Sequence, residues 1–202
     1  MQLILPEHTS PAKLIFDPSD ALSEEAYASF CEANPNLNIE RTAKGEIVIV
    51  PPAGAESDYR SLEIAGELRA WAKKDGRGVV FGSSVEFLLR NGAALSPDAA
   101  WVSHEKLAGL SKEERRKFPR LVPDFIAEVM SPTDRLPVAQ AKMREWLENG
   151  VSLGWLVDGD RQTLYIFQPG QEMETKRSVK TIAVGFPLDG FTLDFTAIWS
   201  GL

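Results

Sequence analysis

The feature that most constrains the fold is a short apolar segment, FIAEVM, followed by a helical segment. Pro123-Asp124 opens FIAEVM, and its length and apolar composition predict a buried strand. After Ser131-Pro132, apolar residues recur at helical intervals from Val138 to Asn149, and Gly150 ends that pattern. Strands interrupted by helices in this way predict an α/β fold, with a mixed central β-sheet flanked by helices.

Earlier segments predict an N-terminal helix, a β-hairpin and a long helix. Ser23 precedes acidic residues and an apolar rhythm, which predicts a helix that ends at Asn34-Pro35. The segment LNIERTAKGEIVIVPP predicts a hairpin around Lys44-Gly45. Apolar residues at helical spacing from Ser57 to Asp75 predict the longest helix, ended by Gly76.

The remaining segments predict further strands. Breaks at Gly82-Ser83-Ser84 and Asn91-Gly92 indicate a central β-meander, with helical excursions in HEKLAGLSKEERRKFP as an insertion. Leu153 to Val157 and Thr163 to Phe167 predict another hairpin, and the tail predicts a strand and a final turn. The sequence has no repeat and no linker. We therefore expect one domain over 1–202: helix and hairpin in 1–52, a core in 53–170 and C-terminal strands in 171–202.

Few residues could bind soft metals or form disulfides. The only histidines are His8 and His104, and Cys31 is the only cysteine, so any metal would be held mainly by oxygen ligands. The start of the chain has no positive region followed by an apolar run, and no apolar run approaches about 18 residues. We expect a cytoplasmic protein with no membrane partner.

The net charge of −7, from 22 basic and 29 acidic residues, is unfavourable for a protein that meets DNA phosphates. Basic residues are concentrated in Arg69 to Arg77 and in Lys112 to Arg120. Either segment could contact phosphate, although solvated helix faces have the same composition.

Glu128 lies at the centre of the predicted strand FIAEVM, and its neighbours at a spacing of two, Ile126 and Met130, are both apolar. A buried carboxylate without a partner costs several kcal/mol, so Glu128 must have a partner, take up a proton or bind a metal. The alternative is a glutamate on an edge strand that pairs with a surface arginine.

Asp98 and Lys142 are the other candidate site residues. Asp98 begins a further apolar strand in LSPDAAWV, but Pro123-Asp124 repeats the Pro-Asp dipeptide, and at least one of the two is expected to be only a turn. Lys142 falls within the apolar arc of its helix, where it either snorkels to water or pairs with a carboxylate. Two carboxylates and a lysine suit phosphodiester hydrolysis, because the acids can hold Mg²⁺ or Mn²⁺ while the lysine positions the nucleophile.

These motifs together resemble a known family. SPD, the strand end EVMSP, the helix lysine and GWLVD, within Leu37 to Gly170, are similar to the Uma2 restriction-endonuclease family, also called domain of unknown function 820. The resemblance implies a restriction-endonuclease-like core of the PD-(D/E)XK superfamily. It also implies a metal-dependent DNA endonuclease, with Mg²⁺ or Mn²⁺ as cofactor and DNA as substrate. The alternative is a catalytically silent nucleic-acid-binding or protein-interaction module on the same fold.

The resemblance also assigns roles to residues. It makes Asp98 the aspartate of the PD motif and Glu128 the strand glutamate, and both would hold the metal. The usual lysine position, two residues after the glutamate, is Met130, so Lys142 would take that role from the following helix. A further acid would be Glu56 or, alternatively, Glu63. A homodimer is expected, because two symmetric sites can cut both strands of a duplex.

Overall fold

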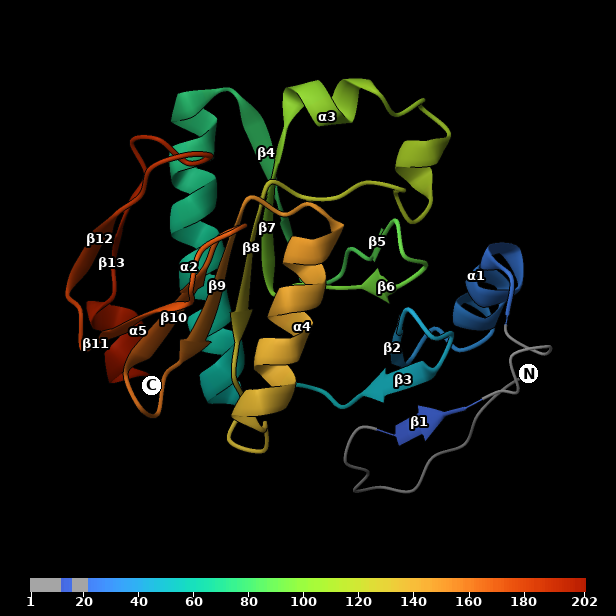
Figure 1. The fold of residues 1–202 in the computed structure, drawn as a ribbon, viewed down its shortest axis with the longest axis horizontal. Coiled ribbons are helices and arrows are strands. Elements are labelled where there is room, and N and C mark those ends of the chain that lie inside the picture. Colours follow the sequence, from blue (N-terminus) through green and yellow to red (C-terminus); the bar gives the residue numbers. More distant parts are fainter. Residues whose placement is uncertain (1–11, 16–21) are drawn as a thin grey trace.

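The computed structural model describes residues 12–15 and 22–202. Segments 1–11 and 16–21, which include His8 and the start of the expected N-terminal region 1–52, lie outside the described residues. Within the described part, runs of strands are interrupted by helices along the chain (Figure 1).

A six-stranded mixed sheet forms the centre of the molecule, in the strand order β11-β10-β9-β8-β7-β4. Only β8 and β9 run parallel, because the helix α4 carries the chain back between them; every other pair is antiparallel. The predicted mixed sheet flanked by helices is therefore confirmed. Its strands are β4 (Gly78–Gly82), β7 (Ala99–Ser103), β8 (Phe125–Val129), β9 (Leu153–Asp158), β10 (Thr163–Phe167) and β11 (Glu174–Arg177).

The two long helices pack on opposite faces of this sheet (Figure 1). α2 (Ala55–Asp75) is the expected longest helix, and Gly76 ends it with a φ of 75°. α4 (Leu136–Asn149) begins two residues before the expected start, and Gly150 ends it with a φ of 113°. These glycines adopt the left-handed conformation that other residues rarely take.

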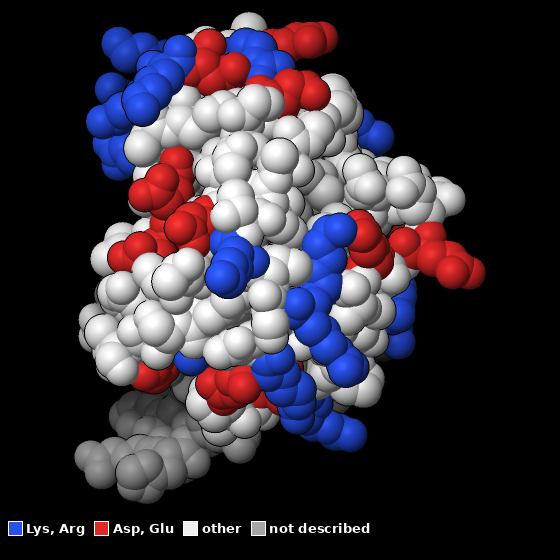
Figure 2. Space-filling model, turned by 90° about the vertical axis from the view of Figure 1, so that its left-hand side faces the viewer, with Lys and Arg blue, Asp and Glu red and all other residues white. Residues whose placement is uncertain are grey.

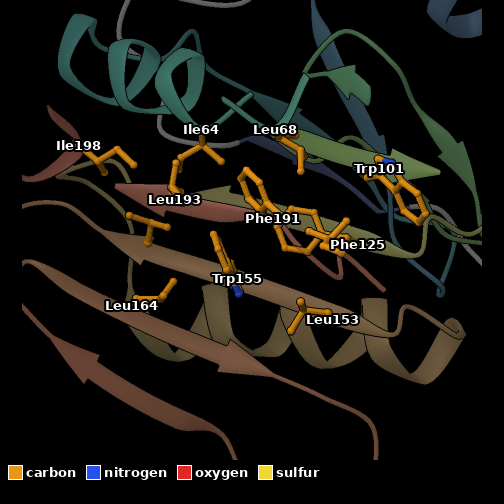
Figure 3. Packing of buried hydrophobic residues seen from close by; sticks show 14 of the residues in the cluster. Ile64, Leu68, Trp101, Phe125, Leu153, Trp155, Leu164, Phe191, Leu193 and Ile198 are labelled. Atoms are coloured by element: carbon orange, nitrogen blue, oxygen red, sulfur yellow. The ribbon is translucent and has the colours of Figure 1, made fainter. Parts of the chain in front are cut away.

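The α2 face of the sheet carries the larger aromatic core. Ile64 and Leu68 of α2 pack with Phe125 and Trp155 of the sheet, and Phe191 lies beside them (Figure 3). The C-terminal elements cover the same face and contribute side chains that include Leu193 and Ile198. They are β12 (Thr181–Ala183), β13 (Thr192–Asp194) and α5 (Thr196–Ser200).

The α4 face of the sheet has a second core. Met143 and Trp146 of α4 pack with Ile126 and Met130 of the β8 segment. Because successive side chains of a strand point to opposite faces, Glu128, which lies between Ile126 and Met130, is on the α4 face. The position of Glu128 in the chain therefore places it under α4.

A second, five-stranded sheet has the order β1-β3-β2-β6-β5 and packs with α1 (Glu24–Glu32). Its β2–β3 hairpin confirms the predicted hairpin, and Ser23 caps α1 as predicted, accepting a hydrogen bond from Ala26 N at 3.2 Å. The strands are β1 (Ala12–Leu14), β2 (Asn38–Arg41), β3 (Ile47–Val50), β5 (Phe87–Leu88) and β6 (Ala94–Leu95).

The predicted central meander is wrong. β4 pairs directly with β7 in the six-stranded sheet, whereas β5 and β6 pair with each other and join β2 of the second sheet. Apolar alternation locates a strand but does not determine which sheet it joins. The predicted helical excursions after β7 are present as α3 (His104–Ala108) and a 3₁₀ turn, η2 (Glu114–Arg116).

Candidate active site

Asp98 and Glu128 lie at neighbouring strand ends. β7 and β8 are antiparallel with Ala99 opposite Ala127, and this register, continued by one residue, places Asp98 opposite Glu128. Asp98 Oδ2 accepts a hydrogen bond from Val129 N at 2.7 Å. The structure therefore brings the two sequence-predicted acids together on the α4 face of the sheet.

Glu128 is held by two side chains of α4. Its Oε1 lies 3.0 Å from Lys142 Nζ and accepts a hydrogen bond from Trp146 Nε1 at 3.1 Å. Lys142 and Trp146 are four residues apart, so they lie one above the other on the same helix face. β8 is a central strand between β7 and β9, which excludes the alternative of an edge-strand glutamate paired with a surface arginine.

Lys142 points into the protein and does not snorkel away from it. Its Nζ contacts Glu128 at 3.0 Å, Glu40 Oε1 at 2.9 Å and the backbone oxygen of Ser96 at 3.4 Å. An ammonium has three N–H donors, and three acceptors surround this one. The side chain is 28% exposed, so water still reaches it.

Glu40 is the acid that the sequence did not identify. It lies on β2 of the second sheet, and its Oε1 also accepts a hydrogen bond from Ser96 N at 3.0 Å. In the sequence it occupies an ordinary polar position of a hairpin strand, where alternate residues face water. No local pattern sets it apart, because its partners are more than 50 residues away along the chain.

Burial and charge act against each other in this cluster. Burial raises the pKa of Asp98 above its usual value and raises the pKa of Glu128 to about 7, although the nearby ammonium of Lys142 opposes both shifts. Burial by itself lowers the pKa of Lys142, but the carboxylates of Glu128 and Glu40 outweigh it and raise that pKa. Three carboxylates thus share one ammonium, which leaves excess negative charge in a partly buried place.

The donor set of this cluster fits a divalent cation. Across the described residues, hydrogen bonds engage only Oδ2 of Asp98 and Oε1 of Glu128, so the second oxygen of each carboxylate has no protein partner. In the same part of the chain, no group of three or more His, Cys, Asp and Glu side chains is arranged to hold a metal. Two carboxylates suit Mg²⁺, which usually keeps several waters and is held through one or two carboxylates plus substrate phosphates.

Met130, at the usual position of the superfamily lysine, is buried in the core beneath α4, and its backbone N–H bonds to the oxygen of Val157. The additional acids Glu56 and Glu63 are not brought to the cluster. Both lie on α2, which covers the opposite face of the sheet. Glu56 pairs with Arg60 at 3.4 Å and accepts from the backbone N–H of Leu202 at 3.3 Å.

Asp124 belongs to the second Pro-Asp dipeptide and has a structural role. Its Oδ2 accepts a hydrogen bond from Ser103 N at 2.8 Å, and its Oδ1 pairs with Lys106 at 2.9 Å. It therefore anchors the start of α3 to the strand β8.

Several side chains of the two basic segments pair with acids. Arg77 contacts Asp75 at 2.8 Å, Lys117 contacts Glu113 at 3.3 Å, and Arg120 pairs with Glu24. Figure 2 shows basic side chains gathered at the upper left and in a stripe on the right of this side, with acidic side chains and uncharged surface between the two. No helix among the described residues is long and apolar enough to cross a membrane.

Comparison with known proteins gives one family and one similar fold. The profile of the Uma2 family, described as "Putative restriction endonuclease", matches residues 24–196. No curated protein sequence matches the chain. The chain is similar to the crystal structure of "a putative nuclease belonging to DUF820" from Anabaena variabilis, with a TM-score of 0.66 and 21% identity over 80% of this chain and 89% of that one. This likeness confirms the predicted nuclease-like fold.

Proposed function

Because this chain belongs to the Uma2 family, we propose that it is a metal-dependent DNA endonuclease that hydrolyses phosphodiester bonds. The observation that carries the proposal is the arrangement of three side chains on one face of the sheet. Asp98 and Glu128 occupy opposed positions on neighbouring strands, and the Lys142 ammonium lies 3.0 Å from Glu128.

Asp98 and Glu128 would hold Mg²⁺ or Mn²⁺ through their carboxylate oxygens. Such a cation would polarise the scissile phosphate and lower the pKa of a bound water. The cation would also balance the excess negative charge of the cluster and would oppose the effect of burial, which raises the pKa of both acids. Both acids would then remain ionised at neutral pH.

Lys142 would act as a fixed positive charge. Its raised pKa keeps the ammonium protonated at neutral pH, so it cannot serve as the general base. It can donate a hydrogen bond to the attacking water or to a phosphate oxygen, which stabilises the negative charge that develops during hydrolysis.

We also propose that the protein is cytoplasmic and forms a homodimer. A homodimer is expected because the single site of each 22.3 kDa chain cuts one DNA strand, and a two-fold axis places a second site on the other strand. The net charge of −7 predicts weak DNA binding. Sedimentation of the protein with and without a DNA duplex measures its oligomeric state and its affinity for DNA.

Nicking of supercoiled plasmid with Mg²⁺ or Mn²⁺ tests the proposal. Asp98→Ala should abolish nicking, because it removes one of the two metal-binding carboxylates. Asp124→Asn is the matched control: it alters the other Pro-Asp dipeptide, whose carboxylate bonds Ser103 and Lys106, and should leave nicking intact in folded protein. If the wild-type chain does not nick DNA, the catalytically silent binding or interaction module replaces this proposal. If Asp98→Ala nicks DNA as fast as wild type, the nicking does not come from this site and the proposed site is wrong.

A further inference from the structure

Glu40 brings the second sheet into contact with the candidate active site. We propose that Glu40 is a positioning residue, which holds the Lys142 ammonium in place when Glu128 turns its charge to a bound cation. This inference rests on the proposed function of the same site.

Glu40, Lys142 and Ser96 all contact one another. A single oxygen, Oε1, accepts from Lys142 Nζ at 2.9 Å and from Ser96 N at 3.0 Å, and Lys142 also reaches the oxygen of Ser96 at 3.4 Å. The Glu40 side chain is only 13% exposed. The carboxylate therefore ties the lysine of α4 to the backbone two residues before Asp98.

Glu128 alone cannot hold Lys142 during metal binding. When its carboxylate coordinates a cation, part of its negative charge is neutralised, and its attraction for the ammonium weakens. The lysine stem is flexible and its ammonium is strongly hydrated, so a lysine with only the Ser96 oxygen as partner would turn toward water. Glu40 is not one of the two proposed metal-binding acids. It therefore keeps its full negative charge, and its attraction for the Lys142 ammonium, while the cation is bound.

The position of Glu40 is itself fixed by its neighbours. The residues before and after Glu40 in the chain, Ile39 and Arg41, are both buried. Arg41 donates to the oxygens of Gly92 at 3.0 Å and Leu22 at 3.3 Å, and its guanidinium lies 4.7 Å from the ring centre of Tyr27. β2 is thus anchored on both sides of Glu40, and the second sheet becomes part of the site.

Glu40→Gln tests the role with little change in shape. Glu46→Gln is the matched control, because Glu46 lies in the same hairpin and also makes one ion pair, with Lys13 at 3.1 Å, away from the site. We expect Glu40→Gln to lower kcat for plasmid nicking about 10- to 100-fold, as losses of orienting groups typically do, while KM for DNA stays unchanged. Glu40→Asp keeps the charge and should fall between Glu40→Gln and wild type.

A second readout does not depend on cleavage. Proton exchange of the Lys142 ammonium, followed by ¹⁵N NMR, should be slow in wild type and in Glu46→Gln, with and without Mg²⁺. In Glu40→Gln it should become fast when Mg²⁺ is added. Equal exchange in wild type and Glu40→Gln overturns the inference, even if cleavage falls, and so does an unchanged kcat. If no protein cleaves DNA, the proposed function fails, and the exchange rates alone then decide whether Glu40 holds Lys142.

Discussion

Glu86 is a buried acid whose charge should limit the stability of the protein above neutral pH. It precedes β5, is 5% exposed and accepts a hydrogen bond from the hydroxyl of Tyr27. Burial raises the pKa of Glu86 to about 7 from its ordinary value of 4.5. The folded state therefore holds this proton more tightly than the unfolded state, and stability is lost as pH rises from about 4.5 to about 7.

The size of the effect follows from these two pKa values. One unit of pKa difference corresponds to about 1.4 kcal/mol, so the raised pKa of Glu86 lowers the free energy of unfolding, relative to its value at low pH, by about 1 kcal/mol near pH 5 and about 3 kcal/mol near pH 8. Glu86→Gln removes the charge but also introduces a buried amide, whose cost does not depend on pH. The free energy of unfolding of the variant, relative to wild type, should thus rise by about 2 kcal/mol between about pH 5 and about pH 8.

Urea unfolding at the two pH values, without divalent cations, measures this difference. Glu105→Gln, on the exposed side of α3, is the control and should show no such change. The comparison between pH values is the decisive quantity, because the amide cost cancels in it. If the difference between Glu86→Gln and wild type is the same near pH 5 and near pH 8, Glu86 ionises normally and the burial argument is wrong.

Two further predictions concern the site and the sheet. Lys142→Met should lower plasmid nicking at least about 100-fold, while the Mn²⁺ affinity measured by calorimetry stays equal or rises, because an ammonium repels a cation. Glu128→Gln should weaken both nicking and Mn²⁺ affinity. If Lys142→Met nicks DNA at the wild-type rate, Lys142 is a packing residue. Gly78→Ala should lower the free energy of unfolding by about 1–3 kcal/mol, because a Cβ there would collide with the backbone oxygen of Val102. Gly82→Ala on the same strand has open space and should change it little; equal losses in thermal melts would contradict the steric argument.

Glu128 and Lys142 could be identified from the sequence because each is polar where the local pattern is apolar. Glu128 interrupts a buried strand, and Lys142 interrupts the apolar face of a helix. Local periodicity gives the direction of a side chain, so it could predict that both point inward and that they need partners. The long helix and the β2–β3 hairpin were predictable for the same reason, since their turns and caps are local.

Long-range pairing was not predictable in this way. Glu40 alternates with the buried Ile39 and Arg41, as a solvated hairpin residue would, and only the docking of the second sheet brings it to Lys142. The same limit explains the misplaced β5 and β6, whose strand signals were correct and whose sheet was not. β11 lies in the region 171–202, where C-terminal strands were predicted, but its own bounds were not predicted, because its sequence, ETKR, is polar throughout, as is common for an edge strand.

The two faces of the central sheet become complete at different stages of protein synthesis. The buried side chains beneath α4, on the face of Asp98 and Glu128, all come from residues 87–167. The α2 face also needs Leu188, Phe191, Leu193, Phe195 and Ile198. A ribosome makes the chain from its N-terminus. All buried side chains beneath α4 are therefore synthesised before the C-terminal residues 188–198 that pack on the aromatic side chains of the α2 face. A chain that ends before residue 188 would therefore leave Trp155 and its neighbours without part of their apolar cover, although the strands and helix that carry Asp98, Glu128 and Lys142 would be complete.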